Sequence, residues 1–124
     1  MKAVILIIYL MIVTYASLSS SVGGAAIHSY SLNDKLMHFT GYAILSILLA
    51  SMLGVSSPGK WTFWKIVLLS SLYGLLMEIL QMICNTGRLF EYFDIVANIF
   101  GAFAGTMLIY VFYRSNKKEN PKPN

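Results

Sequence analysis

Four hydrophobic runs, separated by short polar segments, make up most of this 124-residue sequence. They cover Val4–Leu18, Leu36–Val55, Ile66–Cys84 and Ile95–Tyr113. A helix needs about 20 predominantly apolar residues to cross a bilayer, and each run is close to that length. The pattern predicts an all-α membrane protein: a bundle of four transmembrane helices in residues 1–114, followed by a disordered cytoplasmic tail in residues 115–124.

The composition agrees with this architecture. The chain is 57% hydrophobic and 11% charged, and a soluble domain of this size could not bury so much apolar surface. The net charge of +4 does not indicate a nucleic-acid partner, because the basic residues flank the hydrophobic runs. The expected partners are therefore membrane lipids, with no nucleic acid.

The first run has a second interpretation. Lys2, followed by apolar residues and then by the small residues of Ala16–Ala26, also fits a secretory signal peptide. Cleavage would leave three helices and an external N-terminus, without moving the polar residues described below. We expect the first helix to be retained.

Basic residues are distributed unevenly between the two ends of the predicted helices. With the first helix retained, one side of the membrane carries Lys2, Lys60, Lys65, Arg114, Lys117, Lys118 and Lys122. The other side carries only Lys35 and Arg88. Because an excess of Lys and Arg in short loops marks the cytoplasmic face, we predict a cytoplasmic-membrane protein with both termini in the cytoplasm.

Polar residues inside the runs form one stripe on each of three helices. The stripes are Asp34, His38 and Tyr42; then Ser71, Gly74, Glu78 and Gln81; then Asp94, Asn98, Gly101 and Gly105. Steps of three and four residues place each stripe on one helical face. The second and fourth helices enter from the face through which the third leaves, so we predict one polar cluster near the external face of the membrane.

The cost of burying charge favours a functional role for this cluster. A carboxylate that faces lipid costs about 2.5–3.5 kcal/mol, so Glu78 is expected to face the bundle. Its candidate partners are His38, Arg88 or a proton of its own. With Asp94, these make four ionisable groups near one depth. That number exceeds what helix packing requires and favours a ligand-binding or catalytic site.

Structural roles are the alternative for several of these residues. Asn33 or Asp34, and likewise Asp94, can cap the helix that follows. Small residues let membrane helices approach closely, and the expected packing positions are Gly74, Gly101 and Gly105. Interhelical hydrogen bonds worth roughly 0.6–2 kcal/mol each are a sufficient role for His38, Tyr42, Gln81 and Asn98 taken singly.

The order of these residues carries a family resemblance. It runs Asp34-Lys35-x-x-His38-x-x-x-Tyr42, then Glu78-x-x-Gln81, Arg88 and Asp94-x-x-x-Asn98-x-x-Gly101-x-x-x-Gly105. From Ser17 to Gly105 the sequence resembles the VanZ-like membrane protein family. The resemblance implies a four-helix bacterial protein, and the family's namesake is associated with resistance to teicoplanin, a lipoglycopeptide that acts on the cell wall. The Ser17–Ser21 run also resembles the family pattern and favours an uncleaved first helix.

Two classes of function are open. In the first, an envelope protein binds a lipid-linked or lipoglycopeptide molecule, whose headgroup meets Arg88, Glu78 and Asn98; a guanidinium binds phosphate or carboxylate bidentately. In the second, an intramembrane enzyme uses Glu78 or His38 as general base on a lipid or cell-wall substrate, and Arg88 stabilises developing charge. We rank binding first, with tolerance to teicoplanin-type antibiotics as its consequence.

Other classes have less support. A His, Glu and Asp set can hold a metal ion, but one histidine in the spans is few for a zinc site, and the single Cys84 excludes a cysteine-rich site. We expect no metal and no cofactor. A transporter would require an oligomer, because one copy has too few helices for the usual inverted repeats.

Overall fold

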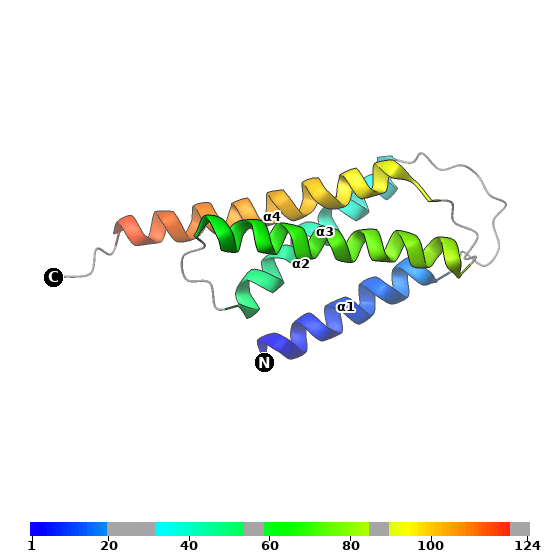
Figure 1. The fold of residues 1–124 in the computed structure, drawn as a ribbon. Helices are drawn as coiled ribbons and strands as arrows, with labels where there is room; N and C mark the ends of the chain where they lie inside the picture. The colour runs from blue at the N-terminus through cyan, green and yellow to red at the C-terminus, as the bar shows by residue number, and fades with distance from the viewer. Residues whose placement is uncertain (20–31, 54–58, 85–89, 120–124) are drawn as a thin grey trace.

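The computed structural model describes residues 1–19, 32–53, 59–84 and 90–119. Its four helices are α1 (Lys2–Leu18), α2 (Leu32–Met52), α3 (Lys60–Ile83) and α4 (Tyr92–Glu119). The described residues contain no strand, and the predicted all-α class is confirmed. The helices run alternately up and down (Figure 1). At one end of the bundle α1 and α3 finish and α2 and α4 begin. We call this the distal end, because α1 begins and α4 finishes at the opposite end.

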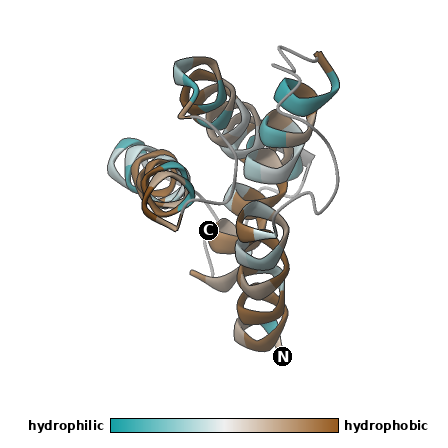
Figure 2. Ribbon diagram, turned by 90° about the vertical axis from the view of Figure 1, so that its right-hand side faces the viewer, coloured by the Kyte–Doolittle hydropathy of each residue, from teal (hydrophilic) through white to brown (hydrophobic). Residues whose placement is uncertain are grey.

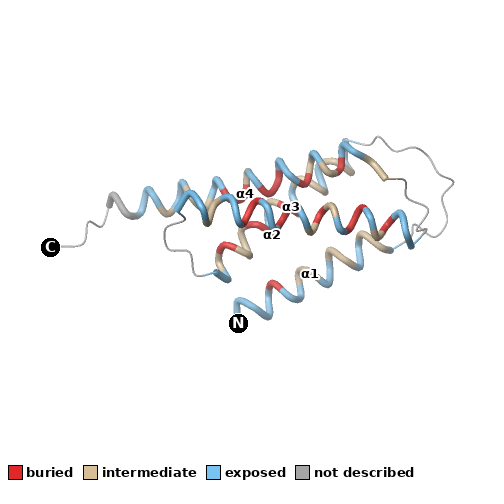
Figure 3. Tube along the Cα trace, viewed as in Figure 1, coloured by how far each residue is buried: buried red, intermediate tan, exposed pale blue. Residues whose placement is uncertain are grey.

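Three of the helices are long and apolar enough to cross a membrane, namely α2, α3 and the Tyr92–Asn116 part of α4. Their outward faces carry exposed apolar side chains such as Leu108 and Phe112, which suit a lipid environment. Figure 2 shows that most helical turns are hydrophobic. Figure 3 shows that only short stretches of the helices are buried within the bundle. The chain is thus a membrane protein. At 17 residues α1 is a shorter apolar helix, and its crossing of the membrane stays a prediction.

The helices extend beyond the predicted hydrophobic runs. α2 begins at Leu32 rather than Leu36, and α3 begins at Lys60 rather than Ile66. The hydropathy pattern marks only the part of a helix that contacts hydrocarbon, whereas backbone hydrogen bonding continues into the polar zone at each membrane surface.

The predicted disordered tail requires a correction. α4 continues as a helix to Glu119, so the prediction for residues 115–124 is wrong for 115–119. The sequence Lys117-Lys118-Glu119 consists of good helix formers, which allow the helix to propagate past the hydrophobic run. The remainder of the predicted tail, residues 120–124, lies outside the described residues.

The closest helix pair is α2 with α4. A Cβ atom added at Gly101 would lie 2.1 Å from the carbonyl oxygen of Phe39, and one added at Gly105 would lie 2.2 Å from that of Ala43. Both distances are far shorter than any real contact, so the backbones of the two helices approach each other where only glycine fits. This approach sets the distance between α2 and α4.

A small apolar core holds α1 against α2 and α3. Its buried members are Leu6, Tyr42 and Leu45. Tyr9 adds a polar link, because its hydroxyl donates to the carbonyl oxygen of Gly41 at 2.7 Å. The fold therefore places α2 between α4 on one side and α1 on the other.

Candidate functional site

An ion-pair network joins the start of α2 to the start of α4 at the distal end. Lys35 Nζ lies 2.5 Å from Asp94 Oδ1 and also donates to Glu91 Oε2. The Asp94 side chain is 8% exposed and that of Lys35 is 19% exposed. One ammonium thus serves two carboxylates in a largely desolvated place, where the loss of a partner is costly.

His38 lies one turn further along α2, between two residues of α4. Its Nδ1 is 3.0 Å from Asn98 Oδ1, and its Nε2 is 3.7 Å from Asp94 Oδ2. Asp34, one turn before His38, presents a carboxylate oxygen within 4.8 Å of potential ligand atoms of His38 and Asp94. We call the following residues the polar cluster: Asp34, Lys35, His38, Glu91, Asp94 and Asn98.

The two aspartates lie in the first turns of their helices rather than in front of them. Asp34 is the third residue of α2, and Asp94 is the third residue of α4. Their carboxylates therefore add favourable negative charge near the helix N-termini. The alternative of a capping residue applies to neither aspartate, since each is the third residue of its helix and a capping residue precedes the first.

The α3 residues of the predicted site point in two directions. Glu78 is 1% exposed, so its side chain faces the bundle rather than lipid. Gln81 is directed to α1, where its Nε2 donates to the carbonyl oxygen of Ser17 at 2.9 Å. Gln81 thereby ties the last turn of α1 to α3 at the distal end.

Asn98 is the place where α2, α3 and α4 meet. It is 1% exposed and contacts His38 on one side. On the other side, a Cβ atom at Gly74 would lie 2.7 Å from Asn98 Nδ2 and 3.0 Å from Tyr42 Cε1. Gly74 therefore provides the space that the buried amide occupies.

Four predicted site residues are not members of the polar cluster: Glu78 and Gln81, described above, and Tyr42 and Arg88. Tyr42 is buried in the core with Leu6 and Leu45, and its ring lies 6.4 Å from that of Tyr73 between centroids. Arg88 lies in residues 85–89, outside the described residues.

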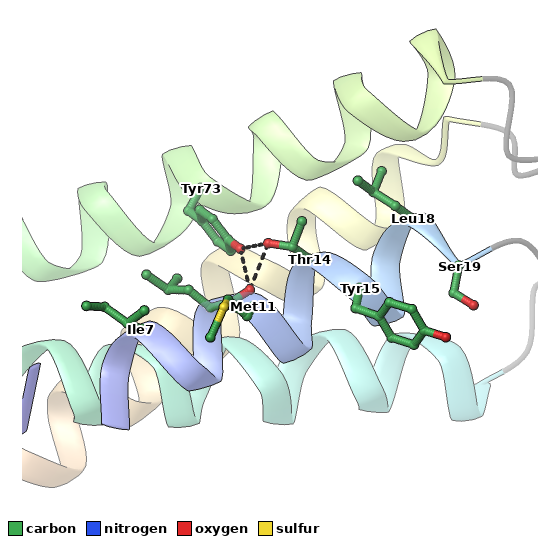
Figure 4. A pocket seen from close by; sticks show the side chains of 8 residues that line it. Ile7, Met11, Thr14, Tyr15, Leu18, Ser19 and Tyr73 are labelled. Carbon is green, nitrogen blue, oxygen red and sulfur yellow. Dashed lines mark hydrogen bonds between the residues drawn. The ribbon is translucent and has the colours of Figure 1, made fainter. Parts of the chain in front are cut away.

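An apolar groove of about 600 Å³ runs along α1, beside Tyr73 of α3, toward the distal end. Its lining residues are Ile7, Leu10, Met11, Thr14, Tyr15, Leu18, Ser19 and Tyr73. Figure 4 shows its two central hydroxyl groups paired, with Thr14 Oγ1 2.7 Å from Tyr73 Oη. The carbonyl oxygen of Leu10 lies 2.7 Å from Thr14 Oγ1 and 3.1 Å from Tyr73 Oη, so it accepts from one hydroxyl while the other hydroxyl donates to its neighbour. With these groups satisfied inside the protein, the groove presents an apolar surface.

The comparison with known families decides the identification. A family model described as VanZ/LLP1 matches residues 3–113, nearly the whole chain. This chain belongs to the VanZ/LLP1 family. The resemblance predicted from the stripes of polar residues is confirmed. No curated protein and no solved structure matches the sequence.

Two features of the site in this VanZ/LLP1-family bundle are not among the predictions from the sequence. One is Glu91, although its spacing of three residues from Asp94 places both near one helical face. The other is the groove. The hydroxyl residues Thr14 and Tyr73 mark it in the sequence, but only the packing of α1 against α3 brings them together.

Proposed function

We propose that this VanZ/LLP1-family protein binds a lipid-linked or lipidated molecule of the bacterial cell envelope. The polar headgroup lies at the polar cluster, and an apolar chain lies in the groove between α1 and α3. The observation that carries the proposal is that a charged, largely buried cluster and an apolar groove lie toward the same end of one small bundle. A ligand with both a polar and an apolar part would satisfy both.

The length of the groove supports an acyl or prenyl chain as occupant. Its lining on α1 runs from Ile7 to Ser19, which corresponds to about 18 Å along the helix axis. Half of the hydrocarbon thickness of a bilayer is about 15 Å. A single chain that enters from the distal membrane surface would therefore reach to about the midplane along this groove.

The chemistry of the polar cluster supports a headgroup that contains hydroxyl or amino groups. Asp34, Glu91 and Asp94 carry carboxylate oxygens, which accept hydrogen bonds from such donors. Sugar and peptide parts of envelope molecules carry these groups. Arg88 remains the predicted partner for a phosphate or carboxylate.

The proposal includes an orientation in the cytoplasmic membrane, with the polar cluster toward the outside. Lys2 supports it, since its Nζ donates to the carbonyl oxygen of Ser51 at 3.2 Å at the end opposite the polar cluster. Lys60 and Lys65, in the first turns of α3, belong to that same end. An excess of basic residues there is typical of the cytoplasmic face.

Lipid analysis of the purified protein tests the proposal. Met11 lines the groove, and Met11→Trp would fill part of it. Met107 on α4 is also exposed, and it does not line the groove, so Met107→Trp is the matched control. We expect wild type and Met107→Trp to retain an envelope lipid enriched over the membrane extract, and Met11→Trp to lose most of it. Equal lipid content in all three proteins would contradict the proposal.

One observation favours the catalytic alternative. His38 Nε2 lies 3.7 Å from Asp94 Oδ2, so a candidate general base lies beside a carboxylate that can stabilise its protonated form. The same lipid analysis separates the two functions. An enzyme would convert the enriched lipid to a product on incubation, whereas a binding protein would return it unaltered.

A further inference from the structure

Three potential metal ligands converge between α2 and α4 at the distal end. Asp34 and His38, one turn apart on α2, and Asp94 on α4 each offer an atom, and these three atoms lie within 4.8 Å of one another. Asp94 is buried, and the other two are partly buried. One imidazole nitrogen and two carboxylate oxygens form a donor set that divalent transition metals accept.

The hydrogen bond of His38 prepares its ring for coordination. Because Nδ1 lies 3.0 Å from an amide oxygen, that of Asn98, Nδ1 must donate. In the neutral ring, Nε2 then carries a free lone pair. This lone pair lies 3.7 Å from the acceptor Asp94 Oδ2. Two electron-pair donors at that separation gain from a cation between them.

Two contacts between α2 and α4 hold the potential ligands His38 and Asp94 in place. Asn98 Oδ1 fixes the orientation of the imidazole, and Lys35 Nζ holds Asp94 Oδ1 at 2.5 Å while Asp94 Oδ2 is directed to His38. Metal-ligating histidines and carboxylates are typically held by such partners, which fix the ligand atoms in place. The charge balance agrees, because the single ammonium of Lys35 is shared by two carboxylates.

We propose that Asp34, His38 and Asp94 bind a divalent first-row transition-metal ion, with Zn²⁺ as the ion to test first. Three protein ligands leave a coordination position for water or another ligand, as in catalytic rather than structural zinc sites. The sequence predicted no metal because the spans contain one histidine. The tertiary structure adds two carboxylates and the residues that orient all three ligands. The site stands independently of the proposed lipid binding.

Zinc titration of the purified protein tests this site. The full chain in detergent is stripped with EDTA, and Zn²⁺ alone is added near neutral pH with bound metal measured by equilibrium dialysis. We expect one ion per chain. His38→Gln should weaken binding by at least about 100-fold, and Asn98→Ala, which removes an outer-shell partner, by about 10–100-fold.

Matched variants place the ion. His28 is the other histidine and Cys84 the single cysteine of the chain, so His28→Gln and Cys84→Ser should bind like wild type. Glu91→Gln removes a carboxylate of the same cluster that is not a ligand, and its affinity should stay within a few-fold of wild type. A loss in His28→Gln or Cys84→Ser with full binding by His38→Gln would overturn the assignment.

Thermal unfolding gives a second readout. Because a ligand of the folded state raises its stability, Zn²⁺ should raise the melting temperature of wild type and leave that of His38→Gln unchanged. If His38→Gln does not accumulate, the same measurement is made with Asp34→Asn, because Asp34 is only partly buried. Absence of stoichiometric binding by wild type, or equal binding by all variants, would refute the metal site whether or not the protein binds lipid.

Discussion

Lys35 is the residue on which the charge balance of the polar cluster depends. It contacts both Glu91 and Asp94 across the interface between α2 and α4. Its side chain is 19% exposed, so few water molecules are available to solvate the ammonium in place of the two carboxylates. In such an environment the penalty for leaving one charge without its partner exceeds the net worth of the intact pair.

Replacement of Lys35 tests this balance. Lys35→Met should lower the free energy of unfolding in detergent by about 3 kcal/mol, because two carboxylates lose the ammonium that they share. Lys65→Met is the control, since Lys65 is exposed at the start of α3, and it should change stability by less than about 0.5 kcal/mol. Equal stability of Lys35→Met and wild type would show that the ion pairs contribute nothing to the fold.

Three substitutions that keep approximate side-chain size separate a functional site from structural hydrogen bonding. They are Glu78→Gln, His38→Gln and Arg88→Lys. An interhelical hydrogen bond contributes only about 0.6 kcal/mol on average, so its loss alone should not abolish activity in a folded protein. We expect each variant to reach wild-type levels in the membrane yet lose the envelope phenotype that deletion causes, with teicoplanin tolerance assayed first. Full activity in all three variants would show that Glu78, His38 and Arg88 have only a structural role.

At the scale of the elements, the contact between α2 and α4 decides whether the polar cluster forms. Gly101 and Gly105 lie against the backbone of α2 at Phe39 and Ala43. This contact brings Asp94 and Asn98 of α4 to the face of α2 that carries His38. Any outward shift of α4 would separate the two halves of the cluster.

A single methyl group tests this helix contact. Gly101→Ala would place its Cβ 2.1 Å from the carbonyl oxygen of Phe39, and the required backbone shift should cost about 1–3 kcal/mol and lower the protein level. Gly41→Ala is the matched control, because its Cβ meets only Tyr9 Oη at 3.8 Å. Wild-type levels of Gly101→Ala would show that the helices are further apart than in this structure.

At the scale of the whole molecule, the alternating helices gather the site at the distal end. α1 ends and α2 begins there, and so do the end of α3 and the start of α4. The basic residues in the first turn of α1 and the first turns of α3 lie at the other end. The predicted orientation therefore turns the polar cluster away from the cytoplasm.

Cysteine labelling of intact cells tests this orientation. In a Cys84→Ser background, single cysteines at Ser21 and Asn85 should react with an impermeant thiol reagent, because both positions belong to the predicted external side. A cysteine at Ser57, on the predicted cytoplasmic side, should react only after the cells are permeabilised. Labelling of the Ser57 position alone would invert the topology.

The sequence by itself determined the helical class, the approximate helix positions and the family. Hydrophobic runs of near-bilayer length leave few other folds, because backbone groups in lipid must be paired within the segment. The steps of three and four residues likewise predicted which side chains share a face, as with Asp34 and His38. The tertiary structure alone decided which faces meet. It paired Lys35 with Glu91, directed Gln81 to Ser17 and formed the groove between α1 and α3, since these contacts depend on how closely the helices approach and on their rotation. The periodicity along one helix does not specify the distance between helices or their relative rotation.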